Sequence, residues 1–212
     1  MPVPFEACVE SVEETREAAA WGAARVELCV DLEHDGCTPT PSLVAECSAA
    51  VDIPVIAMVR SRPGAFVYTH AEIDAMCGVM RDLADRGAAG FATGALRDDG
   101  TIDREATERL VDAADGLPVT FHRAFDRIPD PEEGLGALIA LGARRVLTSG
   151  GGRTAEEGID ALRRLVEQAD GRIEVVAAGA IRPDNVERVV EATGVPAVHA
   201  RWTGWRQAHD RR

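Results

Sequence analysis

Short runs of β-branched and apolar residues alternate along this chain with longer amphipathic stretches rich in Ala, Glu, Leu and Arg. The short runs have the composition of strands and the longer stretches have the composition and spacing of helices. The pattern predicts eight strands, at residues 4–10, 25–30, 54–60, 90–96, 118–125, 144–149, 172–179 and 197–202. It predicts seven helices between them, at residues 11–22, 41–50, 70–86, 103–115, 131–141, 154–169 and 183–193.

This alternation predicts the fold class. Repeated strand–helix units form a parallel sheet with right-handed crossovers, and eight of them match a closed (β/α)8 barrel of the TIM type. An open doubly wound sheet is the alternative, but no Gly-x-Gly-x-x-Gly motif follows the first strand. We therefore expect one barrel domain over residues 1–212.

Little chain remains after the eighth predicted strand. Residues 203–212 form only a short C-terminal tail, so a barrel without its eighth helix is expected. Such a barrel would have an uncovered flank that a second subunit could cover, which predicts a homo-oligomer. The same flank, with Trp202 and Trp205 near it, leaves open a non-enzymatic assembly protein.

The first two predicted strands carry nearly the same motif, Glu-Ala-Cys-Val-Glu at residues 6–10 and Glu-Leu-Cys-Val-Asp at residues 27–31. Alternate side chains of a strand share a face, so the Glu and Cys side chains of each motif point the same way. If the strands are neighbours, Cys8, Cys29 and several carboxylates face one space. Such a set is seldom buried without a function.

Composition excludes several classes of function. The 212-residue chain has a net charge of −13 and contains no lysine, since all 23 basic residues are arginine. Schiff-base chemistry, pyridoxal phosphate attachment and a P-loop all need a lysine. The negative charge argues against a nucleic acid partner. Five scattered cysteines, no membrane-length apolar run and no secretory pattern at the start predict a cytoplasmic protein with free thiols.

Polar residues also lie at the ends of later strands, where barrel enzymes carry their ligand and catalytic groups. By strand parity, Thr120 and His122 face inward while Val119 and Phe121 face the helices, and His199 lies on the polar face of the last strand. The third strand ends in Arg60. These positions predict a charged pocket.

Three segments resemble signatures of the CutC copper homeostasis family: RVELC at residues 25–29, VTFHRAFD at 119–126 and RVLTSG at 145–150. The resemblance runs from Glu6 to about His199. It implies a TIM-type barrel that handles copper in the cytoplasm, with Cys8 and Cys29 as the Cu(I) ligands. The chain departs from the family pattern at residues 60–66, where Ala65 replaces an acidic residue.

Two hypotheses for function follow. The first is cytoplasmic Cu(I) binding by Cys8 and Cys29, because a soft cation selects thiolate ligands. The second is an enzyme of unknown reaction that acts on a small anionic metabolite, either phosphorylated or carboxylated, with Glu27 and His122 transferring protons. Its candidate ligand-binding residues are Glu6, Arg60, Arg62, Arg123, Asp126, Ser149, Gly150, Gly151 and His199. Ser149–Gly152 is included because glycine-rich loops after late barrel strands often hold phosphate.

Overall fold

Eight parallel strands close into a barrel in the computed structural model, which describes residues 3–209. Each strand pairs with the next along the chain, and the last pairs with the first. The strands are β1 (Phe5–Val9), β2 (Arg25–Leu28), β3 (Val55–Met58), β4 (Gly90–Thr93), β5 (Val119–Phe121), β6 (Arg145–Thr148), β7 (Glu174–Ala177) and β8 (Ala197–Arg201). The predicted TIM-type barrel is confirmed.

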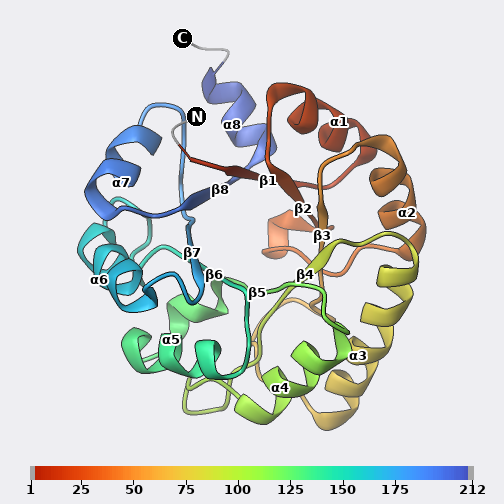
Figure 1. The fold of residues 1–212 in the computed structure, drawn as a ribbon. Helices are drawn as coiled ribbons and strands as arrows, with labels where there is room; N and C mark the ends of the chain where they lie inside the picture. Colours follow the sequence, from red (N-terminus) through yellow and green to blue (C-terminus); the bar gives the residue numbers. More distant parts are fainter. Residues whose placement is uncertain (1–2, 210–212) are drawn as a thin grey trace.

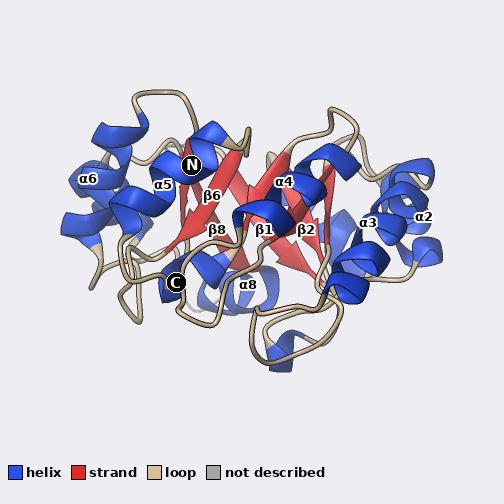
Figure 2. Ribbon diagram, turned by 90° about the horizontal axis from the view of Figure 1, so that it is seen from below, coloured by secondary structure: helices blue, strands red, loops and turns tan. Residues whose placement is uncertain are grey.

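Helices surround the barrel on the outside, as the view along the barrel axis shows (Figure 1). The α-helices are α1 (Val12–Trp21), α2 (Pro41–Ala50), α3 (His70–Asp85), α4 (Arg104–Ala113), α5 (Pro131–Ala140), α6 (Ile159–Ala169), α7 (Val186–Thr193) and α8 (Trp202–His209). Two short 3₁₀ helices, η1 (Leu32–His34) and η2 (Arg123–Arg127), lie in loops that follow β2 and β5. In the side view, loops project beyond the strands at the ends of the barrel (Figure 2).

Local sequence signals explain where several helices begin. Thr69 and Glu72 form a capping box at the start of α3, with each side chain bonded to the backbone N–H of the other residue. Asp130 caps α5 through the N–H groups of its first turn, and Pro131 occupies the first helical position. No helix among the described residues is both long and apolar enough to cross a membrane.

The expectation of a missing eighth helix is wrong. Residues 202–209 form α8, which packs against β1, β8 and α1. Its Trp202 and Trp205 are buried, and the Trp205 ring lies 4.6 Å from that of Phe5 and 5.4 Å from that of Trp21. Burial of two large aromatic side chains stabilises this short helix despite its internal glycine. The tryptophans cover the flank from within the chain, so the sequence-based reason for an oligomer is removed.

Some predicted boundaries also differ from the structure. The strand predicted at 118–125 ends at Phe121, because the His122 side chain accepts the N–H of Ala124 and starts η2. The helix predicted at 154–169 begins only at Ile159. A turn precedes it, in which Gly158 lies so close to the Ser149 carbonyl that a Cβ would be 1.7 Å from the oxygen.

Candidate functional site

A cavity of about 480 Å³ opens at the carboxyl ends of the strands, and we call it the mouth cavity. Barrel enzymes place their catalytic and binding groups at this end of the fold. Strand residues that line the mouth cavity include Cys8, Glu27, Met58, Leu147 and His199. The loop after β5 adds His122, Arg123, Asp126 and Arg127, and the loop after β7 adds Gly179, Ala180 and Arg182.

The two thiols of the repeated motif lie side by side. β1 and β2 are paired, and the Sγ atoms of Cys8 and Cys29 are 3.6 Å apart. Both side chains are buried, with Cys8 lining the mouth cavity and Cys29 behind it, under the loop at Gly36. The hydrogen bond with Cys29, together with burial, raises the pKa of Cys8 well above its usual value. Cys8 is therefore protonated at neutral pH unless a ligand displaces its proton.

An ion-pair network lies nearer the amino ends of the strands than the thiols do. Glu6 is buried and is paired with Arg25 and His199, whose Nδ1 is 2.8 Å from the Glu6 carboxylate. Arg25 also reaches Glu174, at 2.8 Å. Burial opposes ionisation of Glu6, but the His199 and Arg25 contacts lower the pKa of its carboxyl to about 2. Glu6 therefore holds His199 with its Nε2 toward Glu27, whose carboxylate is 3.9 Å away.

Glu27 and His122 each present an unpartnered buried atom. The Oε2 atom of Glu27 and the Nε2 atom of His122 have no hydrogen-bond partner within residues 3–209. Burial raises the pKa of Glu27 to about 7, although His199 favours its charged form. Burial and the charge of Arg60 lower the pKa of His122 to about 3. Since Nδ1 of His122 accepts the Ala124 N–H, its proton is on Nε2. His122 is therefore a neutral hydrogen-bond donor, and Glu27 is an acid–base group that titrates near neutral pH.

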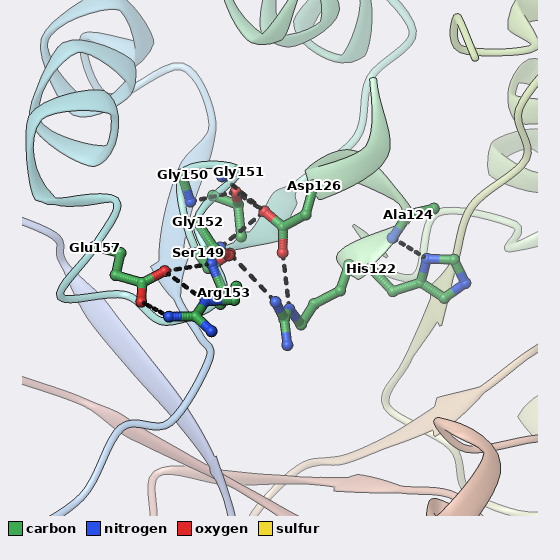
Figure 3. A network of polar contacts seen from close by, with 11 residues as sticks. His122, Ala124, Asp126, Ser149, Gly150, Gly151, Gly152, Arg153 and Glu157 are labelled. Atoms are coloured by element: carbon green, nitrogen blue, oxygen red, sulfur yellow. Dashed lines mark hydrogen bonds and ion pairs between the residues drawn. The ribbon is translucent and has the colours of Figure 1, made fainter. Parts of the chain in front are cut away.

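The glycine-rich loop after β6 is already occupied by a side chain. The Oδ1 atom of Asp126 accepts the N–H groups of Ser149, at 2.9 Å, and Gly151, at 3.3 Å, while its Oδ2 pairs with Arg123 (Figure 3). The N–H of Gly150 is bonded to the Thr148 hydroxyl. Asp126 thus takes the position in which a phosphate was expected, and this loop has few free donors to offer a ligand.

Arg60 and Arg62 do not line the mouth cavity. Arg60 is buried, and its guanidinium donates to the carbonyls of His34, Gly36 and Gly64. Arg62 pairs with Glu72 and donates to the backbone of the same loop. The sequence placed both arginines at the correct strand end, but their guanidinium groups fix the loops after β2 and β3.

Other arginines, which the sequence analysis did not select, line the mouth cavity. They are Arg127, Arg182 and Arg201, in addition to the predicted Arg123. Strand parity predicts that Arg201 shares the face of His199 on the last strand, although Arg201 was not among the candidate site residues. No local pattern distinguishes Arg182, which follows the Ala-Gly-Ala-Ile segment after β7. The cavity also brings together predicted Cys8, Glu27, His122, Asp126 and His199.

One group of side chains has the composition of a metal site. Cys8, Glu27 and His199 are buried, and each offers one ligand atom within 4.8 Å of the other two. With Cys29 beside Cys8, the donors comprise two sulfurs, an oxygen and a nitrogen. Thiol sulfur suits a soft monovalent ion such as Cu(I), so the residues present fit copper.

Comparisons with known proteins agree with this architecture and with the sequence signatures. The model of the CutC family matches residues 3–204. The human copper homeostasis protein cutC homolog is 43% identical over 195 residues, which are 92% of this chain and 71% of that protein. A CutC family protein of Agrobacterium fabrum is 40% identical over 200 residues, 94% of this chain and 79% of that protein.

Solved structures give the same result. A CutC copper homeostasis protein from Streptococcus agalactiae superposes with a TM-score of 0.88 at 32% identity, covering 93% of this chain and 97% of that chain. An aldolase with a TM-score of 0.69 is only 13% identical, covers 98% of this chain and 95% of that chain, and shares the fold alone. The chain therefore belongs to the CutC family.

Proposed function

We propose that this CutC-family protein binds Cu(I) in copper homeostasis, with Cys8 and Cys29 as its ligands. The observation that carries the proposal is the 3.6 Å separation of their buried Sγ atoms on paired strands. Thiolates are the preferred donors of Cu(I), and two of them from adjacent strands need little rearrangement to share one ion. Met58, a further soft donor, packs in the same buried cluster.

Proton release is part of this binding. Cys8 has a raised pKa, so Cu(I) displaces a proton when it converts the thiol to a thiolate. Glu27, with a pKa of about 7, is near enough to serve as the first acceptor of that proton. We assign the activity to the cytoplasm, because all five cysteines are free and a reducing compartment keeps them so.

An anaerobic titration tests this proposal. Cu(I) is supplied from a chromogenic chelator to the wild type, to the Cys8→Ser/Cys29→Ser double variant and to a Cys47→Ser/Cys77→Ser control, whose cysteines lie on α2 and α3. The Cys8→Ser/Cys29→Ser variant is expected to bind Cu(I) more than about 100-fold more weakly than the wild type. This loss is larger than the one caused by replacing a residue that only orients a metal ligand. Wild-type affinity in Cys8→Ser/Cys29→Ser would overturn the proposal.

A second function is favoured by a separate observation. Glu27 Oε2 and His122 Nε2 are buried, unpartnered within the described chain, and border the mouth cavity. Buried polar atoms are normally satisfied, so these two have the character of ligand-facing groups. We propose that the mouth cavity also accepts a small anionic metabolite, with His122 donating a hydrogen bond to it and Glu27 exchanging a proton with it.

Thermal-shift measurements against phosphorylated and carboxylated metabolites identify such a ligand, since binding to the native state alone raises the melting temperature. Each stabilising compound is then incubated with the protein in D2O, and exchange of its carbon-bound protons is followed by NMR. We expect Glu27→Gln to abolish exchange while the thermal shift persists. Exchange at the wild-type rate in Glu27→Gln would contradict the assigned role, and a panel without any stabilising anion would remove this function.

A further inference from the structure

We propose that the mouth cavity contains a subsite for the phosphoryl group of a small phosphomonoester, formed by the backbone after β7 with Arg123 and Arg182. This inference rests on the second proposed function, because it names the substrate class of that site. It does not depend on copper, since neither thiol belongs to the subsite.

The first observation is the backbone after β7. Gly179 and Ala180 border the mouth cavity, and their N–H groups donate to no protein acceptor among residues 3–209. Both residues have positive φ angles, 98° and 54°. That conformation is unfavourable for Ala180, which carries a Cβ, and it turns successive N–H groups away from the ladder of β7. The corresponding groups after β6 are bonded to Asp126, so free backbone donors remain on the β7 side of the cavity.

The second observation is that glycines leave room beside two guanidinium groups, that of Arg123 next to this loop and that of Arg182 next to α8. A Cβ on Gly179 would lie 3.5 Å from Nη2 of Arg123, and a Cβ on Gly204, in the first turn of α8, would lie 3.0 Å from Nη2 of Arg182. Glycine at both positions leaves room for the arginines. Each guanidinium retains unused donors, because within the described residues that of Arg182 donates only to the Ile181 carbonyl and that of Arg123 donates to Asp126 and Ser149.

The charge of the mouth cavity differs from that of the whole chain. The protein has a net charge of −13, yet four arginines and three acidic residues line this cavity. One of the acids, Asp126, is paired with Arg123. The resulting local excess of positive charge attracts an anion into the cavity.

The geometry favours phosphate over carboxylate. One arginine fork satisfies the two oxygens of a carboxylate, whereas the terminal oxygens of a phosphomonoester accept from several directions. Arg123, Arg182 and the backbone N–H groups of Gly179 and Ala180 supply hydrogen-bond donors from the lining of one cavity. His122, with its unpartnered Nε2, borders the same cavity and is placed to contact the remainder of the ligand. Loops after strands seven and eight hold phosphate in many barrels, and this chain supplies the donors there.

Calorimetric titration with glycerol 3-phosphate, at pH 7.5 and constant ionic strength set with NaCl, tests the subsite. We expect saturable binding that is tighter than that of malonate, the carboxylate comparison. Arg182→Gln is expected to weaken binding about tenfold or more, as loss of a hydrogen bond to a charged group does. Gly204→Ala would place a Cβ 3.0 Å from Nη2 of Arg182, which crowds the guanidinium without changing any charge, and we expect it to weaken binding as well.

The matched control is Arg81→Gln, which makes the same charge change at an exposed position of α3 away from the mouth cavity. Binding within twofold of the wild type is expected there. Equal losses in Arg81→Gln and Arg182→Gln would overturn the subsite, as would malonate binding as tightly as glycerol 3-phosphate. If malonate binds as tightly as glycerol 3-phosphate, the phosphoryl subsite is overturned but the proposed binding of a small anionic metabolite is retained. If neither compound binds and no metabolite of the panel raises the melting temperature, the phosphoryl subsite and the second proposed function are both overturned.

Discussion

Replacing Glu27 by Gln is expected to stabilise the metal-free protein, and to stabilise it more as the pH rises. The wild-type carboxyl has its usual pKa of 4.5 in the unfolded chain and a pKa of about 7 when folded, because burial disfavours its charge. As the pH rises from 4.5 to 7, the unfolded state loses this proton first. Folding stability therefore falls over this range, and above pH 7 the full cost remains.

The size of the effect follows from the two pKa values. Each pKa unit corresponds to about 1.4 kcal/mol, so the cost approaches about 3 kcal/mol. Glutamine does not titrate and resembles the protonated acid. The gain of Glu27→Gln over the wild type should grow from about 1 kcal/mol at pH 5.5 to about 3 kcal/mol at pH 8.5. These are upper values, since His199 loses a neighbouring negative charge in the same variant.

Glu6→Gln is the matched control, because Glu6 is equally buried on the neighbouring strand but has a pKa lowered to about 2. Its ionised form stabilises the fold above pH 4.5, and this contribution is lost as the pH falls toward 2. We expect a loss of about 3 kcal/mol at both pH 5.5 and pH 8.5.

Urea unfolding, followed by tryptophan fluorescence in the presence of a chelator, measures the stability of all three proteins. A Glu27→Gln gain that is the same at both pH values would refute the reasoning, because the effect would then be unrelated to ionisation. Lower stability than the wild type at pH 8.5 would refute it as well. Residues kept at a cost to stability are a mark of functional sites.

Three further substitutions test the fold. Trp205→Ala should lower the free energy of unfolding in urea by about 3–5 kcal/mol, because the indole is fully buried against β1 and α1. A loss under about 1 kcal/mol would show that α8 contributes little to stability. Gly158→Ala should lower the melting temperature, since its Cβ would meet the Ser149 carbonyl. Gly136→Ala, at an open position of α5, should instead raise stability by up to about 1 kcal/mol through helix propensity; equal melting temperatures for the two glycine variants would contradict this packing argument.

The periodicity of the sequence was sufficient to predict the barrel and the inward face of its first strands. Strand parity placed Glu6, Cys8, Glu27 and Cys29 on one face, and the structure brings them together inside the barrel. Parity applies only within a strand, however. Glu10, which belongs to the same motif, follows the end of β1 and is exposed, where it accepts the Leu32 N–H.

Long side chains were the main limit of sequence-based inference. Arg60 ends a strand, but the direction of its guanidinium depends on loop carbonyls that become its partners only after folding. Arg182 comes near α8 because Gly204, 22 residues later, leaves space for it. The missed α8 has a similar cause, since its stability comes from tertiary burial of two tryptophans rather than from helix propensity.

The position of the ion pairs among Glu6, Arg25 and Glu174 affects how a metal ion or a metabolite reaches the site. They lie toward the amino ends of β1, β2 and β7, whereas Cys8 borders the mouth cavity at the carboxyl end of the barrel. A ligand bound at Arg123 and Arg182 would occupy the same cavity that Cys8 borders. Binding of a metabolite and binding of a metal are therefore expected to influence each other.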